Sequence, residues 1–126
     1  MKELKFFRCE KCGNIVELVE ESGAPISCCG QKMTKLEAGV VEASREKHIP
    51  VPTVEGDKVR VLVGSVLHPM AEEHNIAWVS LQTDKGSQRK YLEVGASPEV
   101  VFSLNGEKPI AVYAYCNLHG LWKAEI

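Results

Sequence analysis

Residues 110–125 read IAVYAYCNLHGLWKAE, in which two mainly apolar segments flank a short polar connection. Segments 110–116 and 121–125 contain aromatic and β-branched residues and predict antiparallel strands joined by a tight turn. A strand ending at Cys116 and a turn carrying His119 can deliver a thiolate and an imidazole to one ion, and Gly120 relieves the crowding. Because Cys-x-x-His alone is a weak signal, this segment marks a candidate metal site without establishing it.

Further strand-like segments precede this hairpin, and turn signals separate them. They are residues 59–64, 76–83, 88–92 and 99–104. The turn 84–87 can close one hairpin and Asn105-Gly106 begins the connection of another, so neighbouring strands are expected to be antiparallel. Such spacing is typical of a β-sandwich or a β-barrel. The one helical feature expected is a single turn over residues 70–74, after Pro69.

The composition is that of a globular protein, with 126 residues, 44% hydrophobic residues, 25% charged residues and a net charge of -2. No run of lysine or arginine provides an electrostatic footprint for nucleic acid or a membrane surface, so small solutes or protein partners are favoured. The N-terminal residues lack the apolar region of a signal peptide, and no segment has the length of a membrane-spanning helix. We therefore expect a cytoplasmic protein.

Four of the five cysteines crowd the first quarter of the chain: Cys9, Cys12, Cys28 and Cys29. In a reducing compartment, an odd number of cysteines is better explained by thiolate ligands than by disulfides. Residues 1–37 are too few to form a core, and a module of this size usually needs a metal, disulfides or a partner chain to fold, which agrees with the cysteine pattern. We expect this metal-binding module to be followed by a β-domain over residues 38–126.

Four thiolates form a closed tetrahedral shell that suits zinc or a single iron that exchanges electrons. Gly13, directly after Cys12, permits the close backbone approach that such a turn needs. The adjacent pair Cys28-Cys29 must turn both side chains inward, which predicts a distorted tetrahedron. Cys-x-x-Cys followed by Cys-Cys resembles desulforedoxin, a small iron protein, more than rubredoxin or a zinc ribbon. A structural zinc remains the alternative.

The chain has four histidines, and each lies beside a turn or a strand end: His48, His68, His74 and His119. Such positions suit ligands on loops that a rigid sheet supports. His68 and His74 are six residues apart and cannot share one face of a straight helix, so a bend would have to bring them together. Spacing alone leaves open whether these histidines and Cys116 form one site.

Three motifs closely resemble the desulfoferrodoxins and the wider superoxide reductase family over nearly the whole chain. They are EKHIPV at 46–51, HPMxxxH at 68–74 and YCNLHGLWKAEI at 115–126. The resemblance implies an immunoglobulin-like antiparallel β-sandwich, a homodimer and, through the N-terminal cysteines, the two-iron subclass. It also implies a catalytic non-haem iron with four equatorial imidazoles and one axial thiolate, from His48, His68, His74, His119 and Cys116.

The resemblance further implies one-electron reduction of superoxide to hydrogen peroxide, with a rubredoxin-like external electron donor. Lys47 would attract the superoxide anion and help to deliver protons, whereas Glu46 would bind the oxidised iron and help to displace the product. We expect both residues to lie on a mobile loop. Without the resemblance, these two residues would be interpreted as an ordinary solvated charge pair.

Three other functions remain open from the residues alone. A zinc knuckle fused to a protein-binding β-sandwich needs only the first four cysteines. A pure electron carrier would use the N-terminal iron and keep the sandwich as a scaffold. A superoxide dismutase would share the substrate but would evolve dioxygen. Metal content separates the first two functions from a reductase, and the stoichiometry of superoxide consumption separates the third.

Overall fold

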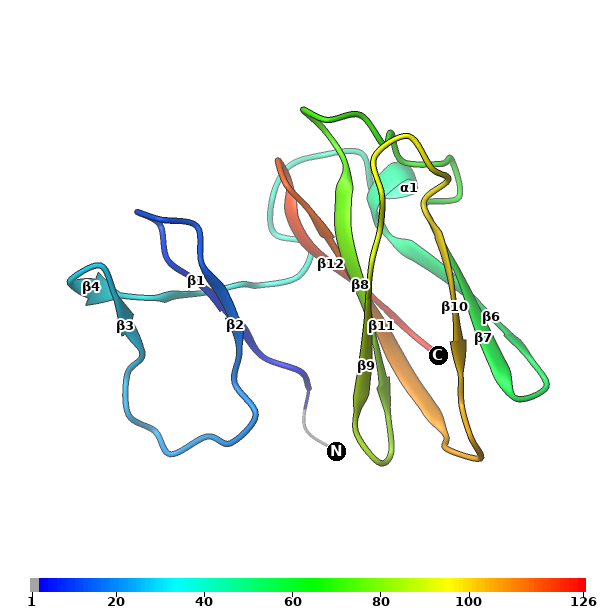
Figure 1. Ribbon diagram of the computed structural model, residues 1–126, viewed down its shortest axis with the longest axis horizontal. Helices are drawn as coiled ribbons and strands as arrows, with labels where there is room; N and C mark the ends of the chain where they lie inside the picture. Colours follow the sequence, from blue (N-terminus) through cyan, green and yellow to red (C-terminus); the bar gives the residue numbers. More distant parts are fainter. Residues whose placement is uncertain (1–2) are drawn as a thin grey trace. The chain divides into compact units, whose positions relative to one another are not determined.

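The computed structural model describes residues 3–126 and divides into two compact units. The first unit ends at Glu37, and the second runs from Ala38 to Ile126. Each unit has its own strands, which Figure 1 shows in sequence colours.

The first unit is a small β-module. Strand β1 (Phe6–Arg8) pairs with β2 (Ile15–Glu17) on one side and β5 (Thr34–Lys35) on the other. Strands β3 (Ser27–Cys28) and β4 (Gln31–Lys32) form a separate two-stranded hairpin. The buried hydrophobic residues among those described in this unit are Phe6, Cys9 and Met33. Because so small a core contributes little hydrophobic stabilisation, the cysteine ligands have to supply cohesion through a metal.

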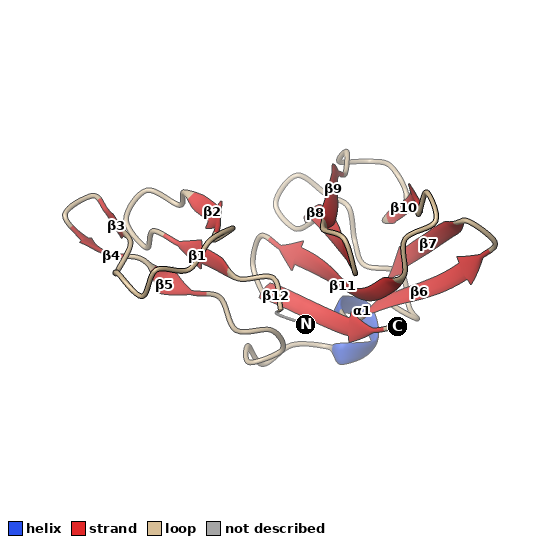
Figure 2. Ribbon diagram, turned by 90° about the horizontal axis from the view of Figure 1, so that it is seen from below, coloured by secondary structure: helices blue, strands red, loops and turns tan. Residues whose placement is uncertain are grey.

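The second unit is a β-sandwich of two antiparallel sheets (Figures 1 and 2). The three-stranded sheet has the order β10 (Glu99–Ser103), β7 (Lys58–Val63), β6 (Pro50–Glu55). The four-stranded sheet has the order β12 (Gly120–Glu125), β11 (Pro109–Cys116), β8 (Ile76–Thr83), β9 (Ser87–Tyr91). One short helix, α1 (Arg45–His48), precedes β6. This arrangement confirms the expected mainly-β fold, a four-cysteine module followed by an antiparallel β-domain.

The core lies between the two sheets and follows from the alternation of side chains along each strand. In β7, Val59, Val61 and Val63 are fully buried, whereas Lys58 and Arg60 are exposed. The buried valines belong to one hydrophobic cluster that also contains residues of β8, β10 and β11. A two-residue period with one apolar face is what a half-buried strand requires. This packed core provides the rigid support for the loops at the strand ends.

A β-bulge at Ala77 of β8 lies opposite the end of β11, beside Cys116. Tyr115 pairs with Trp78, but the next residue, Cys116, pairs with Ile76, so the register shifts by one residue at Ala77. Bulges change the direction of side chains and are common beside functional sites. The bulge turns Ile76 onto the same face as Val79, in the hydrophobic core cluster. Cys116 lies in that cluster by the regular alternation of β11, two residues after Ala114.

Two sequence-based expectations about the second unit were wrong. Asn105-Gly106 was expected to begin the connection of a hairpin, but the strands it joins, β10 and β11, belong to different sheets. Residues 70–74 were expected to form a helical turn, but they form an irregular bend in which Ala71 and His74 exchange backbone hydrogen bonds of 2.9 and 3.2 Å. The sequence also missed β6, whose Pro50 and Pro52 argued against a strand.

Over residues 3–126, the structure contains no helix that is both long and apolar enough to cross a membrane.

Candidate metal centres

The four N-terminal cysteines converge, with their sulfur atoms all within 4.8 Å of one another. The Sγ atoms of Cys12 and Cys28 are 3.7 Å apart, and those of Cys28 and Cys29 are 3.9 Å apart. Sulfurs bound at about 2.3 Å to one tetrahedral metal would be separated by about 3.8 Å. These separations are too long for disulfides, and all four cysteines are free. The cluster therefore fits a single four-thiolate metal ion, which we call centre I.

Backbone conformation explains how the adjacent pair Cys28-Cys29 contributes two ligands. Cys29 has a φ of 54°, in the left-handed region that non-glycine residues rarely occupy. This conformation, followed by Gly30 with a φ of 75°, turns the chain sharply between neighbouring sulfurs. The left-handed conformation costs roughly 1–2 kcal/mol at a non-glycine residue. Backbone strain of this kind is common at functional sites, and here it falls on a candidate metal ligand.

The thiols of centre I differ in acidity. The pKa of Cys9 is lowered to about 6, chiefly because the backbone N–H of Cys12 donates a hydrogen bond to its sulfur, at 3.5 Å. The pKa of Cys29 is raised to about 12, chiefly through its interaction with the Cys12 thiol. Because metal ligands must be thiolates, Cys9 is poised to ionise first, and binding of a cation would release protons from its partners.

The second cluster brings together the five ligand residues suggested by the sequence. One ligand atom from each of His48, His68, His74 and Cys116 lies within 4.8 Å of the others. His119 joins this group because its Nδ1 lies 3.1 Å from His48 Nε2 and 3.9 Å from Cys116 Sγ. We call this cluster centre II.

The four imidazoles of centre II are arranged as a square. Ring centroids are 4.6 Å apart for His48–His68 and His68–His74, 5.1 Å for His74–His119, and 4.9 Å for His48–His119. The diagonal pair His48–His74 is 6.2 Å apart. Nitrogen separations of 3.1 and 3.2 Å along two edges match the distance of about 3.0 Å expected for neighbouring nitrogens bound at about 2.1 Å to one metal.

Backbone carbonyls fix the tautomers of two of these rings. His48 Nδ1 donates to the Ser44 carbonyl oxygen at 2.6 Å, and His68 Nδ1 donates to that of Pro69 at 2.7 Å. The single turn of α1 brings the Ser44 carbonyl beneath the His48 ring, four residues later. A proton on Nδ1 leaves the Nε2 lone pair free, and both Nε2 atoms face the cluster. Sequence reasoning missed these partners, because a carbonyl oxygen is present at every residue.

Two further observations show that the donor set fits a metal. His74 Nε2 is buried and has no hydrogen-bond partner within residues 3–126, which is costly unless a ligand satisfies it. Burial lowers the pKa of His48 and His74, and lowers that of His68 to about 4. All three rings are therefore neutral near pH 7 and available to a cation. A set of neutral imidazoles with one sulfur suits iron and other transition metals.

Cys116 provides the only sulfur of centre II. It is fully buried, and burial raises the pKa of its thiol. Hydrogen bonds from the backbone N–H groups of Leu118 and His119 oppose this shift, because they stabilise the thiolate. A metal cation would favour the same ionised form. The turn between β11 and β12 thus carries two ligand residues, and its backbone N–H groups also donate hydrogen bonds to the sulfur of Cys116.

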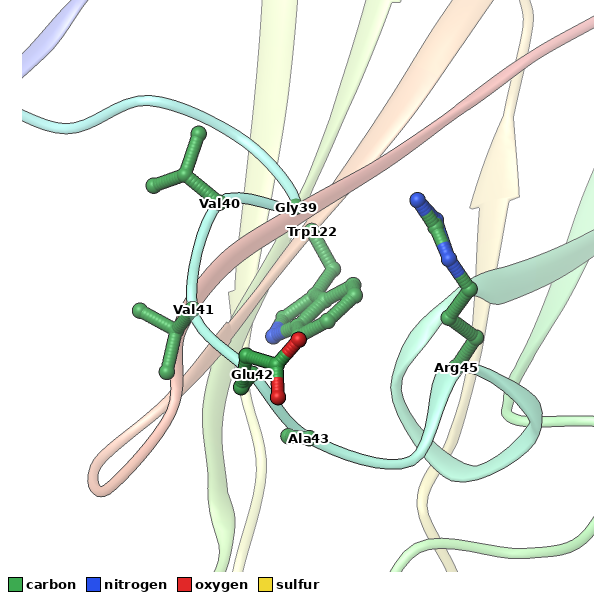
Figure 3. Close-up of a pocket in the computed structure, with 7 residues that line it drawn as sticks. All are labelled: Gly39, Val40, Val41, Glu42, Ala43, Arg45 and Trp122. Atoms are coloured by element: carbon green, nitrogen blue, oxygen red, sulfur yellow. The ribbon is translucent and has the colours of Figure 1, made fainter.

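Trp122 supports the rings from the side. Its indole lies 4.9 Å from the His48 ring, between centroids, and its Nε1–H donates to the His119 carbonyl oxygen at 3.1 Å. The indole also lines a hollow of about 560 Å³, whose rim carries Glu42 and Arg45 (Figure 3). With 2% exposure, Trp122 is a packing residue that holds two ligand loops in place.

Glu46 and Lys47 lie in α1, directly before His48, and both are exposed. Their backbone is anchored to the turn after β7, because the Glu46 carbonyl oxygen accepts hydrogen bonds from Val66 N at 3.1 Å and Ser65 Oγ at 3.3 Å. The sequence had suggested a mobile loop, whereas the structure has a hydrogen-bonded helical turn.

Gly64 makes this close approach possible. Its φ is 91°, and a Cβ atom there would lie 2.7 Å from the Glu46 carbonyl oxygen and 2.8 Å from the Lys47 Cα, as well as clashing with the Val66 carbonyl oxygen. Only glycine has both the conformation and the space. Sequence reasoning missed this residue, since Gly64 closes a strand and resembles any other turn glycine.

Comparisons with known proteins agree with this geometry. The family model described as desulfoferrodoxin matches residues 40–125, and the model for the desulfoferrodoxin N-terminal domain matches residues 1–36. A desulfoferrodoxin from Nitratidesulfovibrio vulgaris is 42% identical over 98% of this chain and 97% of its own length. A superoxide reductase from Pyrococcus abyssi is 37% identical over 64% of this chain and 86% of its own length.

Solved structures show the same relationship. The superoxide reductase from Treponema pallidum is 42% identical, with a TM-score of 0.82 over 98% of this chain and all of the other chain. The two candidate metal sites, one of four cysteines and one of histidines with a cysteine, are consistent with a two-iron protein of this kind. The chain therefore belongs to the desulfoferrodoxin family of two-domain superoxide reductases.

Proposed function

We propose that this chain reduces superoxide to hydrogen peroxide at an iron held in centre II. The proposed ligands are His48, His68, His74, His119 and Cys116. In the reaction, superoxide takes up one electron and two protons. The observation that carries the proposal is the square of four imidazoles beside a single buried cysteine. A ferrous ion held by these residues supplies the electron.

The two sides of the imidazole square differ in a way that suits a small anionic substrate. Cys116 belongs to the hydrophobic core cluster, so its sulfur occupies the core side. His74 and His119 are only partly buried, and Leu118 in the same turn is 58% exposed. We infer that superoxide approaches from the solvent side, opposite the sulfur. Hydrogen bonds from the Leu118 and His119 N–H groups limit the charge that the sulfur donates.

Lys47 is proposed to attract superoxide and to help deliver protons. Its positive charge acts on His48 and His74, since it contributes to lowering the pKa of both rings. The same charge is favourable for an anion that arrives at the imidazole square. The anchored backbone of α1 limits how far Lys47 can move away from the site. We propose that Glu46, on the same turn, supplies a carboxylate that competes with the product after the electron has been transferred.

Centre I is proposed to hold a second iron through Cys9, Cys12, Cys28 and Cys29. Its first role is cohesion of the module over residues 1–37, whose buried core is small. Residues 38–126 would form the catalytic domain. We also propose a rubredoxin-like external electron donor, because each turnover consumes an electron. A homodimer follows from the family resemblance, and a cytoplasmic location suits five free cysteines.

The stoichiometry of the reaction tests the proposed function. The iron-loaded chain is supplied with reduced rubredoxin and a measured flux of superoxide, and rubredoxin oxidation, hydrogen peroxide and dioxygen are all recorded. A reductase oxidises one rubredoxin for each superoxide consumed and evolves no dioxygen. Dioxygen evolution without rubredoxin oxidation would identify a dismutase. Zinc at centre I with no metal at centre II would support a zinc knuckle.

A further inference from the structure

We propose that Asn117 is a positioning residue for centre II, whose side-chain amide ties the turn bearing Cys116 and His119 to the loop bearing His74. The inference rests on the proposed function, since it concerns the same iron ligands. Asn117 would touch neither the metal nor the substrate. Its role would be to hold two ligand-bearing segments, far apart in sequence, at a fixed separation.

Three hydrogen bonds connect Asn117 to the opposite loop. Its Oδ1 accepts from the backbone N–H of Asn75 at 2.9 Å, and its Nδ2 donates to the Glu73 carbonyl oxygen at 3.0 Å. Its backbone N–H donates to the Asn75 carbonyl oxygen at 3.2 Å. The two residues bonded in this way, Glu73 and Asn75, directly flank the ligand His74. The Asn117 amide therefore clamps both sides of one ligand.

A second amide extends the clamp through the bend. Asn75 Nδ2 donates to the carbonyl oxygens of Ala71 at 3.0 Å and Glu72 at 3.1 Å. Ala71 and His74 then exchange two backbone hydrogen bonds. The carbonyl oxygens of residues 71–75 in the irregular backbone thus all accept hydrogen bonds, as a stable loop requires. Through these contacts, the position of the β11–β12 turn determines the position of His74.

His74 needs such support more than His48 and His68 do. The rings of His48 and His68 are each oriented by a hydrogen bond from Nδ1 to a carbonyl oxygen. By contrast, no backbone carbonyl oxygen in residues 3–126 accepts a hydrogen bond from the His74 ring, and this histidine lies on an irregular loop. Because rotation of a loop backbone displaces a ligand directly, the Asn117 clamp substitutes for the missing ring contact.

The chemistry of the amide explains why asparagine suits this position. The side chain at this position must accept a hydrogen bond from one backbone N–H and donate another to a backbone carbonyl oxygen. The amide of asparagine does both, through its oxygen and its nitrogen. Asn117→Asp keeps the acceptor for Asn75 but directs a carboxylate oxygen at the Glu73 carbonyl, which is repulsive. Asn117→Ala removes both side-chain bonds. The alanine variant therefore removes the whole side-chain clamp, and the aspartate variant removes only its bond to Glu73.

Asp57 provides a matched control. Its carboxylate accepts two backbone hydrogen bonds from a distant turn, from Asn105 N at 3.1 Å and Gly106 N at 3.0 Å. Asp57 directly precedes β7, whereas the other end of β7, at Val63, contacts His68. Asp57→Ala thus breaks a similar pair of bonds between loops at the end of the sandwich remote from centre II.

The experiment uses the full iron-loaded chain and makes three measurements. The first is the rate at which a chelator removes iron. The other two are the thiolate-to-iron absorption band of centre II and the rate of hydrogen exchange at the Asn75 backbone amide. We expect Asn117→Ala to release centre II iron about tenfold faster, shift the band and accelerate exchange. Asn117→Asp should show the same changes. Centre I iron, in the same chain, should be released at the wild-type rate, and Asp57→Ala should leave centre II unchanged.

Three results would overturn the inference. Wild-type iron release, absorption and exchange in both Asn117 variants would show that the clamp does not position the ligands. Equal effects in Asp57→Ala would show a general loss of stability instead. A wild-type chain that binds iron in centre II but reduces no superoxide would overturn the proposed function alone. A wild-type chain with no iron in centre II would overturn both.

Discussion

His48 and His74 occupy opposite corners of a square of four imidazoles, with ring centroids 6.2 Å apart, although 26 positions separate them in the chain. His48 ends a helical turn, whereas His74 lies in an irregular bend. Their facing positions require that loops from different parts of the sandwich be held with sub-ångström accuracy. The predictions that follow test the groups that hold them.

The two centres should lose their metals independently. Cys9→Ser should remove the iron of centre I, because serine oxygen is a poor replacement for a thiolate that ionises readily. His119→Ala should weaken the iron of centre II while leaving centre I loaded. Iron analysis with the absorption spectrum of each variant checks this expectation. Loss of both irons in either variant would contradict independent sites.

Lys47→Ala should slow superoxide capture by roughly tenfold at low ionic strength, and the remaining rate should depend less on salt, because a steering charge is gone. Pulse radiolysis over a series of ionic strengths measures both quantities. Lys85→Ala is a suitable control, because Lys85 is an exposed lysine in the turn between β8 and β9. An unchanged rate and an unchanged salt slope in Lys47→Ala would exclude the proposed steering role.

Gly64→Ala should disturb the turn that carries Glu46 and Lys47. The added Cβ would meet the Glu46 carbonyl oxygen at 2.7 Å, so α1 must shift. We expect a loss of stability of about 3 kcal/mol or more, since close backbone contact adds to the conformational cost. Urea unfolding followed by tryptophan fluorescence reports on the second unit, because Trp78 and Trp122 both lie there.

Gly56→Ala separates steric contact from backbone conformation. Gly56 also has a positive φ, 60°, but a Cβ there would meet nothing within 4 Å. Its replacement should cost only about 1–2 kcal/mol and leave the absorption of centre II unchanged. Equal losses of stability in the two variants would show that the contact between Gly64 and α1 is unimportant.

The stability of the iron-free chain should fall as the pH is lowered from 6.5 towards 4. Burial lowers the pKa of His68 from 6.5 to about 4, so in this window the unfolded chain binds more protons than the folded chain. Stability is at its full value above pH 6.5, and about 3 kcal/mol of it is lost by the time the pH has fallen to 4. His68→Gln should therefore have a shallower pH dependence than the wild type in urea unfolding. Parallel curves would contradict this prediction.

The sequence predicted strands well where one face is buried and the other is not. The alternation in β7 is unambiguous, because Val59 and Val61 flank the exposed Arg60. Sequence patterning failed to predict β6, where Pro50 and Pro52 remove two backbone N–H donors. Such prolines are tolerated because β6 lies at the edge of its sheet. Hydrophobic patterning alone does not reveal that position.

Turn chemistry was also only partly informative. Asn105 and Gly106 do have positive φ values of 53° and 81°, as their residue types suggest. The flanking strands nevertheless pair in different sheets. A local preference for a turn does not determine which sheet the next strand joins, because that depends on contacts distant in sequence.

The four cysteines of centre I could be proposed as ligands from their spacing, whereas spacing left the histidines and Cys116 open and only the family resemblance joined them into one site. The groups that orient these ligands could not be proposed from the sequence. The carbonyl oxygens of Ser44 and Pro69 have no signature in a sequence, and the left-handed conformation of Cys29 is unusual for its residue type. Positions of this kind appear only when the backbone is known.

Crystallography of the iron-loaded chain with anomalous data at the iron edge tests the central claim most directly. We predict a peak in centre II within bonding distance of one nitrogen from each of the four histidines and of the Cys116 sulfur. We also predict a second peak among the four N-terminal sulfurs. An iron-loaded crystal in which the four imidazoles surround no iron, or surround zinc, would contradict the account.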